Sequence, residues 1–313
     1  MALPWLHIQR NIINNQPYPV LYENTSLFYA FQKTRRLLLE VGESSPIDTL
    51  GSSKLPGVWL KRLDDLTTIA KYRPHYNGEE RWSPAPEGFT SHQLAHHLGQ
   101  DHDQIMSQIC GKILVPFSIA IILFADSLGG LQPTVELLAR LLKPDPVAHF
   151  QSCPRLLVVL RGTPCDERVL ERLITAEISC VFRKCHPESP LSESDALQMW
   201  SSRVDRLQVI SDEPSEIAIA MKEISLSWKK QGSDYSAVNF HKLMQRAINW
   251  FCQGQGEAFN ILDGLCIRDP VTKHAKAYLE EFLNRKARDG FDYLAIAVSC
   301  LAYHIYTLNV SGL

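Results

Sequence analysis

The sequence has no strong excess of charge of either sign. Its 313 residues contain 32 Lys and Arg against 34 Asp and Glu, so the formal net charge is −2, and the pI is about 6.6. Proteins that bind nucleic acids need a concentrated positive surface, because much of their affinity comes from neutralising phosphates. We therefore expect no nucleic-acid partner.

Secretory and disulfide signals are also lacking. The eight cysteines include no Cys-x-x-Cys pair, and the apolar start of the chain is interrupted by Pro4 and His7 without a cationic region before it. Reduced thiols and a cytoplasmic location are the simplest expectation. Residues 293–313 carry no Asp, Glu, Lys or Arg, which is nearly the length of a membrane span. Because His304 and Asn309 interrupt this segment, a buried helix is favoured, with a membrane anchor or an interfacial segment as alternatives.

Two catalytic motifs are missing. There is no Gly-x-Ser-x-Gly, so the chain has no nucleophile elbow of the lipase and esterase type. There is also no Gly-x-x-x-x-Gly-Lys-Ser/Thr phosphate loop. The stretch from Gly51 to Lys54 is superficially similar, but its lysine precedes the second glycine, Gly57. We interpret it as a linker.

The most informative feature that is present is an unbroken apolar run, residues 117–125, followed by Asp126, Gly129 and Gly130. Continuous hydrophobicity predicts a strand buried on both faces of a parallel sheet. Asp-x-x-Gly after such a strand is also how nucleotide-hydrolysing switch domains present a carboxylate to Mg²⁺ and a glycine amide to a phosphate.

Apolar strands and helices alternate after this run, which is typical of right-handed βαβ units. The sequence thus predicts an α/β fold with a mostly parallel sheet and flanking helices, Rossmann-like or degenerate P-loop-like. A helical subdomain is expected after it, because no strand pattern appears beyond residue 216. The predicted strands are 156–160, 178–182 and 207–210, and the predicted helices are 133–142, 166–176, 194–204, 217–228, 236–252, 272–288 and 291–308.

The first 88 residues are expected to form a loop-rich extension that packs on the core. A short strand is predicted at Val20 and a helix over residues 27–41, where apolar residues recur at intervals of three and four. The predicted division is 1–88 for the extension, 89–232 for the α/β domain and 233–313 for the helical subdomain.

Five residues are candidates for a nucleotide or metal site. Asp126 would bind Mg²⁺ through water, with Gly129 and Gly130 next to the phosphates. Thr163 and Asp166 follow the strand at 156–160 as a Thr-x-x-Asp, in the position where GTP-binding folds keep their base-reading motif, but Pro164 replaces the lysine. The alternatives are structural: Thr163 as the cap of a helix that begins at Pro164, with Asp166 favouring the positive end of that helix, and Asp126 with the glycines as a turn.

A weaker metal candidate is the histidine cluster around His92 and His96. Thr90 or Ser91 is expected to cap a helix that runs toward Cys110, and on that helix the two histidines would share a face. The glutamate of His-Glu-x-x-His is missing. A solvated helix terminus is therefore the favoured interpretation.

Residues 121–131, Ile-Ile-Leu-Phe-Ala-Asp-Ser-Leu-Gly-Gly-Leu, resemble an element in the non-catalytic N-terminal region of large fungal patatin-like phospholipase proteins. The Pro-Arg strand at 154–159 and the Met-Trp-Ser-Ser-Arg-Val-Asp-Arg segment at 199–206 resemble further elements of that region in order and distance, and residues 113–308 are covered in all. Asp126, Gly129 and Gly130 match the first of these elements, at residues 121–131. Ser127 departs from it, because the family more often has an acidic residue at that position.

The resemblance implies no activity for this chain, because the patatin domain with its catalytic residues would lie C-terminal to the region that matches. The leading hypothesis is a non-catalytic accessory, regulatory or interaction module that lacks a cofactor and binds a protein partner or a patatin or lipase domain. The alternatives are a GTP- or ATP-binding switch that uses Asp126 and Mg²⁺, and a module associated with lipid surfaces through its uncharged C-terminal segment.

Overall fold

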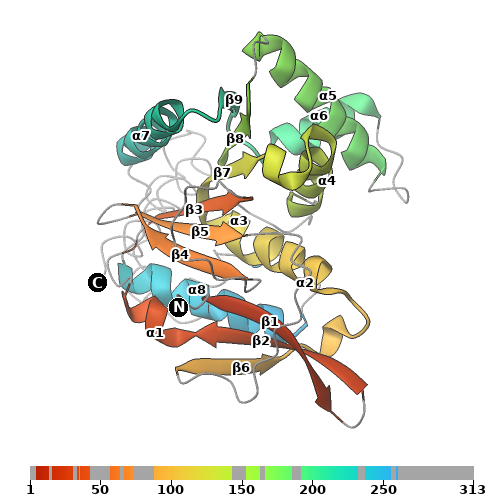
Figure 1. The fold of residues 1–313 in the computed structure, drawn as a ribbon, viewed down its shortest axis with the longest axis vertical. Helices are drawn as coiled ribbons and strands as arrows, with labels where there is room; N and C mark the ends of the chain where they lie inside the picture. The colour runs from red at the N-terminus through yellow and green to blue at the C-terminus, as the bar shows by residue number, and fades with distance from the viewer. Residues whose placement is uncertain are drawn as a thin grey trace, which may run out of the picture.

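The computed structural model describes residues 5–13, 16–30, 34, 36–42, 57–63, 67–72, 88–142, 153–162, 166–184, 192–231, 237–254 and 259. These residues form one nine-stranded sheet, in the order β6-β2-β1-β4-β5-β3-β7-β8-β9, and helices that flank it (Figure 1). The strands are β1 Leu6–Ile13, β2 Gln16–Asn24, β3 Arg36–Val41, β4 Val58–Arg62, β5 Thr67–Tyr72, β6 Phe89–Gln93, β7 Ser118–Phe124, β8 Arg155–Leu160 and β9 Leu207–Ser211.

The sheet has a parallel half and an antiparallel half. β5, β3, β7, β8 and β9 run parallel to one another, whereas β6, β2, β1 and β4 pair antiparallel, and β4 also pairs antiparallel with β5. The α/β class with flanking helices is confirmed. The sheet is mixed, because the four antiparallel pairings in the described part of the chain equal the four parallel ones.

The strand that precedes Asp126 lies where the sequence predicts it. β7 is buried along its whole length and has parallel neighbours on both sides, β3 and β8. β8 and β9 also form at the predicted apolar runs. Their side chains alternate between two packed faces, which is why these strands are continuously apolar.

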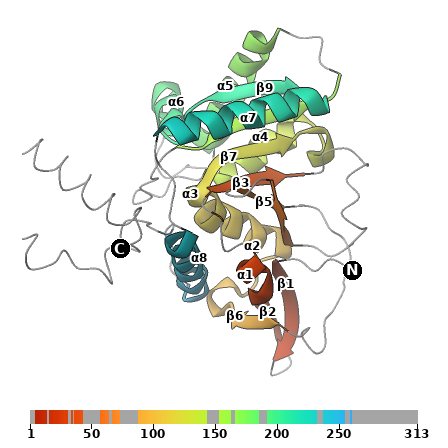
Figure 2. The same ribbon diagram turned by 90° about the vertical axis from the view of Figure 1, so that its left-hand side faces the viewer.

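Helices cover both faces of the parallel half. One core joins alternate strand residues to α2, α4, α5 and α8, and the other joins the remaining strand residues to α7. Figure 1 shows α7 on the opposite side of β8 and β9 from α4, α5 and α6, and Figure 2 shows α8 beside the lower, antiparallel part. The helices are α1 Thr25–Ala30, α2 His102–Ile109, α3 Val115–Phe117, α4 Leu131–Leu141, α5 Glu167–Lys184, α6 Glu193–Ser201, α7 Pro214–Gln231 and α8 Ala237–Cys252.

The predicted helix over residues 27–41 is wrong. Among the described residues of this range, only those of the short α1 are helical, and β3 is a strand near the centre of the sheet, with all six residues buried. A short apolar run such as Leu37-Leu38-Leu39 fits a buried strand and a buried helix equally well by periodicity. Hydrogen bonding to β5 on one side and β7 on the other decides the matter.

Two further elements differ from the prediction. Residues 178–182 are not a strand but the continuation of α5, which buries Ile174, Ile178 and Val181 at helical spacing. The helix expected from residue 90 begins only at His102, after Asp101, whose side chain accepts a hydrogen bond from the backbone of Gln104 in a capping box. Phe89–Gln93 is instead β6, at one end of the strand order.

The described part of the first 88 residues is richer in strands than expected, because it supplies β1 to β5 of the same sheet. The domain boundaries at residues 88 and 232 stay a prediction. α8 forms where a helix is predicted, whereas the helices expected at 272–288 and 291–308 lie outside the described residues.

Candidate functional site

The parallel half has a topological switch point between β3 and β7. In chain order its strands are β3, β5, β7, β8 and β9, but in space β5 lies on one side of β3 and the other three lie on its other side. In open α/β sheets, ligands bind beyond the carboxyl ends of the strands at such a reversal. The ends of β3 at Val41 and of β7 at Phe124 therefore define the candidate site.

Asp126 lies at this edge, two residues beyond the end of β7. It opens a short 3-10 turn, and its carboxylate accepts a hydrogen bond from the backbone N–H of Arg161, at 2.7 Å. Arg161 is the first residue after β8. Asp126 thus ties the ends of two neighbouring strands together, and its side chain is otherwise exposed. This is the role of a turn residue, with no metal contact needed to explain it.

The two glycines complete the same turn. Gly129 and Gly130 have φ values of +92° and +103°, which favour glycine. The N–H of Gly130 donates to the carbonyl of Ala125 at 2.8 Å, and the Gly130 carbonyl accepts from the hydroxyl of Thr134 at 2.7 Å in the first turn of α4. Both glycines therefore reverse the chain between β7 and α4.

A side chain fills part of the space at the switch point. Gly42 follows β3 directly, with φ of +95°, and the Ser127 hydroxyl lies so close to it that a Cβ on Gly42 would overlap the oxygen. The Ser127 hydroxyl donates to the Phe124 carbonyl at 2.9 Å. The backbone of Gly42 and the side chain of Ser127 are thus in contact at the place where a phosphate group would have to approach the end of β3.

Of the second pair of candidates, Thr163 and Asp166, the structure describes only Asp166. Asp166 precedes α5, and its carboxylate accepts from the N–H of Arg168 at 3.0 Å while its carbonyl accepts from Val169 and Leu170. Asp166 is therefore itself the helix cap, whereas the structural alternative expected it inside the first turn of a helix capped by Thr163. Thr163 lies outside the described residues.

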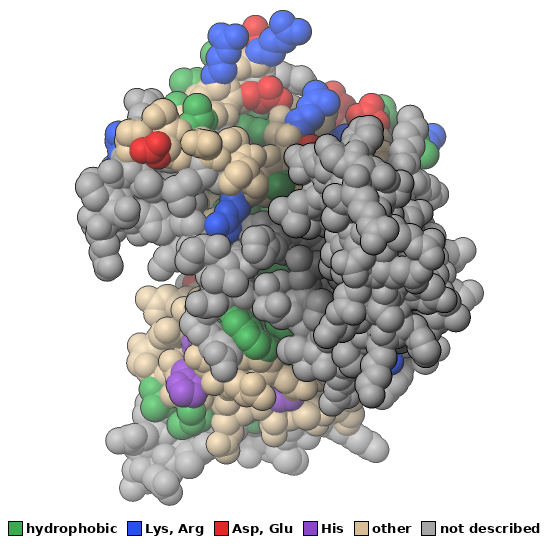
Figure 3. Space-filling model, turned by 180° about the vertical axis from the view of Figure 1, so that it is seen from behind, with side chains coloured by type: hydrophobic (Ala, Val, Ile, Leu, Met, Phe, Trp, Pro, Cys, Tyr) green, Lys and Arg blue, Asp and Glu red, His purple; other side chains and the backbone are tan. Residues whose placement is uncertain are grey.

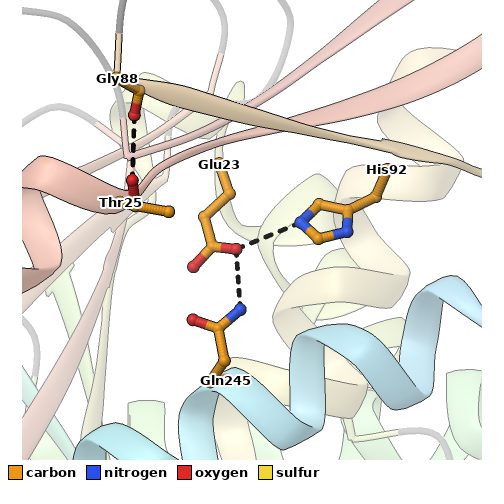
Figure 4. A network of polar contacts seen from close by, with 5 residues as sticks. All are labelled: Glu23, Thr25, Gly88, His92 and Gln245. Carbon is orange, nitrogen blue, oxygen red and sulfur yellow. Dashed lines mark hydrogen bonds and ion pairs between the residues drawn. The ribbon is translucent and has the colours of Figure 1, made fainter.

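The histidine cluster does not form a metal site. His92 lies on β6, and its Nε2 is 3.2 Å from Oε2 of the fully buried Glu23 on β2 (Figure 4). The amide of Gln245, on α8, donates to the same oxygen at 3.1 Å. His96 instead lies in a 3-10 turn and packs against Gly254. No group of three or more His, Cys, Asp or Glu placed to hold a metal ion occurs among the described residues.

His97, next in the cluster, gives a pH dependence that can be measured. Its ring stacks on Phe251 with centroids 4.7 Å apart, and its Nδ1 lies 3.1 Å from Oε1 of Gln100. Burial, with smaller effects from Lys112 and His96, holds the pKa of His97 below its ordinary value of 6.5, although the Gln100 contact acts in the opposite direction.

We expect the free energy of unfolding to fall as the pH falls below about 6.5. At such a pH His97 of the unfolded chain binds a proton, whereas His97 of the folded protein, with its lower pKa, does not yet do so. One such group gives a slope of at most about 1.4 kcal/mol per pH unit, and the loss ends once the lower folded pKa is passed. Urea unfolding at a series of pH values measures it. The slope should be smaller in His97→Asn, and parallel curves for the two proteins would contradict the assignment.

Three of the four described cysteines are unsuited to nucleophilic chemistry. Burial raises the pKa of Cys110 and Cys153, and it raises the pKa of Cys252 to about 12 with a further contribution from Glu23. A thiol is reactive as its thiolate. These three side chains therefore stay protonated near neutral pH.

Sequence reasoning missed the stretch of sequence that follows β3, of which the structure describes only Gly42. Residues 42–49 read Gly-Glu-Ser-Ser-Pro-Ile-Asp-Thr. Set against Gly-x-x-x-x-Gly-Lys-Ser/Thr, this stretch keeps the first glycine and the final threonine, but Ile47 replaces the second glycine and Asp48 replaces the lysine. The similarity is not apparent when residues 36–41 are interpreted as a helix, because a phosphate loop follows a strand.

A scan against protein-family models and a search of curated proteins each found no match for this chain. Within the described residues, none of the helices combines the length and the apolar composition that crossing a membrane requires. The uncharged residues 293–313 lie outside that part of the chain.

Proposed function

We propose that this chain is a non-hydrolysing accessory or interaction module built on a nucleotide-hydrolase-like α/β fold. The observation that carries the proposal is the stretch after β3. In the sequence this stretch follows a strand that ends at the switch point, as a phosphate loop would, but Ile47 and Asp48 take the places of the glycine and the lysine.

Both replacements work against a bound triphosphate. The lysine of a phosphate loop neutralises the phosphates, and the loop's glycines let backbone amides surround them. An aspartate in the lysine position adds repulsion instead. The Arg161 contact of Asp126 and the packing of Ser127 on Gly42 support the same conclusion, because they use the switch point for structure.

An interaction role is supported by the outer helices. Several large apolar side chains on α5, α6 and α7 are about half exposed, and Figure 3 shows basic side chains beside hydrophobic ones at the end of the molecule that carries α5. Scattered exposed leucines are normal, but neighbours on one helix favour a protein contact. The resemblance to the N-terminal region of patatin-like proteins makes a patatin or lipase domain one candidate partner. The exposed side chains are Val169, Leu173, Leu197, Ile219 and Leu226.

Nucleotide titration tests the proposal. Calorimetry with Mg²⁺ and non-hydrolysable GTP or ATP analogues is expected to show no saturable binding at micromolar concentrations, and no shift in the thermal midpoint. Micromolar binding that disappears in Asp126→Ala, but persists in Glu136→Ala on the exposed side of α4, would overturn it in favour of a GTP- or ATP-binding switch.

A further inference from the structure

A groove of about 480 Å³ lies between α5 and α6, which pack side by side (Figure 1). All but one of its lining residues belong to α5, where most of them recur as i, i+4, i+7, i+8 and i+11 and so share one face of the helix. This face spans about 16 Å along the helix axis, and the groove is therefore elongated. The lining residues are Arg168, Glu171, Arg172, Thr175, Ala176, Ser179 and, on α6, Leu197.

Exposed apolar side chains are grouped around this groove. Leu197, which lines it, is 42% exposed, and Val169 and Leu173, on an adjoining side of α5, are 46% and 58% exposed. α5 packs on the core with other side chains, among them Ile174 and Ile178, so the fold does not use these three. Single exposed apolar residues are normal on a surface, but a group of them favours a contact with another molecule.

The middle of the groove is lined by small side chains, those of Thr175, Ala176 and Ser179. Small residues at a contact let two helices approach closely. The Ser179 hydroxyl already donates to the Thr175 carbonyl at 2.9 Å, so an apolar side chain can cover it without leaving a buried donor unpaired. A second helix can therefore lie along this part of α5.

Two charges in the groove are not compensated by the chain itself. Arg168 and Arg172 are exposed, and neither guanidinium takes part in an ion pair or a hydrogen bond within the described part of the chain. Glu171 also lines the groove, so the lining carries one net positive charge. Both arginines keep all their donors for a carboxylate from another molecule.

The stability of α5 does not explain these two arginines. Their spacing of four residues places like charges on neighbouring turns, and Arg168 lies in the first turn, at the positive end of the helix dipole. Both arrangements are unfavourable for a helix by itself. A carboxylate held between the two side chains would remove the repulsion and accept charge-assisted hydrogen bonds from both.

We propose that the groove between α5 and α6 binds an acidic amphipathic helix of a partner protein. Its carboxylates pair with Arg168 and Arg172, and its apolar side chains pack against Leu173, Ala176 and Leu197. Recognition of this kind combines the apolar face of a helix with a groove, and the charges select the partner. The proposal rests on the interaction role proposed above and adds the site and the chemistry of the partner.

A synthetic helical peptide of about four turns tests the groove. It carries leucines on one face, glutamates on the adjoining face and a fluorescein label, and fluorescence anisotropy measures its binding to the full chain. We expect a Kd of about 10–100 μM, as for weak contacts of small area, and weaker binding as the salt concentration rises, because salt screens exposed ion pairs. A peptide with lysine in place of each glutamate should not bind.

Arg168→Gln combined with Arg172→Gln should weaken binding of the acidic peptide by at least about tenfold. This double variant should fold, with no fall in its thermal midpoint, because it removes two like charges from neighbouring turns. Arg183→Gln combined with Lys184→Gln is the matched control. It removes the same charge from the last turn of α5, outside the groove, and should change the affinity by no more than about twofold, because screening separates the two ends of the helix.

Three results would overturn the proposal: no saturable binding of the acidic peptide, equal binding of the lysine peptide, or equal affinity in the Arg168 and Arg172 double variant and the wild type. Vesicles that contain phosphatidylserine offer another source of negative charge. Binding to them that depends on Arg168 and Arg172, without binding of the peptide, would assign the groove to a lipid surface instead. None of these results alters the outcome of the nucleotide titration, which tests the non-hydrolysing character of the chain separately.

Discussion

Replacing Glu23 by alanine is expected to lower the free energy of unfolding by about 3 kcal/mol. The carboxyl group is fully buried, and its Oε2 receives both the Gln245 amide, at 3.1 Å, and His92, whose Nε2 lies 3.2 Å away (Figure 4). It therefore joins β2 to the edge strand β6 and to α8, which are far apart in sequence. Truncation leaves two polar side chains without their acceptor and opens a cavity between three elements.

Glu23→Gln is the matched control. Its amide oxygen can accept from both His92 and Gln245, and its NH₂ takes the place of Oε1, which has no partner among the described residues. In Glu23→Gln an unpaired amide NH₂ group replaces the unpaired Oε1. The glutamine also carries no negative charge, so any free-energy cost of burying that charge is removed. We therefore expect a change within about 1 kcal/mol of the wild type.

Urea unfolding of both variants, with Gln245→Leu combined with each, measures this network. Gln245→Leu should lower the free energy of unfolding less in the Glu23→Ala background than in the wild type, because Glu23→Ala has already removed the acceptor of the Gln245 amide. The difference between the two backgrounds, which is the coupling energy, should be about 1 kcal/mol. If Glu23→Gln destabilises as much as Glu23→Ala, charge rather than hydrogen bonding holds α8 to β2, and our account of the contact is wrong.

Within the parallel half, β7, β8 and β9 could be predicted, whereas β3 and β5 were not. β7 and β8 are apolar runs buried on both faces and separated by helices, a pattern typical of a covered sheet, and β9 repeats it with Val209 and Ile210. The antiparallel half carries no such signal. β1 and β2 mix polar and apolar residues, and β2 contains two prolines, so that pairing along eight registered positions, rather than composition, makes them strands.

The candidate site could be predicted only in part. Asp126, Gly129 and Gly130 were found because they directly follow a recognised strand. The stretch after β3 was missed because Arg36–Val41 has the same local pattern as a helix. The Glu23 contacts with β6 and α8 depend on long-range packing, which no spacing in the sequence reveals.

Gly42→Ala is expected to destabilise the protein by about 3 kcal/mol, for two separate reasons. The backbone has φ of +95°, which costs a residue with a Cβ about 1–2 kcal/mol. The new Cβ would also overlap the Ser127 hydroxyl and lie 3.2 Å from both the Cβ and the carbonyl oxygen of Phe124. Because β3 and β7 are hydrogen-bonded neighbours, the Phe124 backbone has little room to move, and such overpacking adds about 1–3 kcal/mol.

Gly162→Ala separates the two causes. Gly162 follows β8 at the same edge of the sheet with φ of +65°, but a Cβ there would meet no atom within 4 Å. Only the backbone cost of about 1 kcal/mol should appear. Thermal and urea unfolding of both variants compare them directly, and Gly42→Ala combined with Ser127→Gly should recover part of the loss by removing the overlapping hydroxyl. Equal destabilisation of the two single variants would show that Ser127 does not close the space above β3.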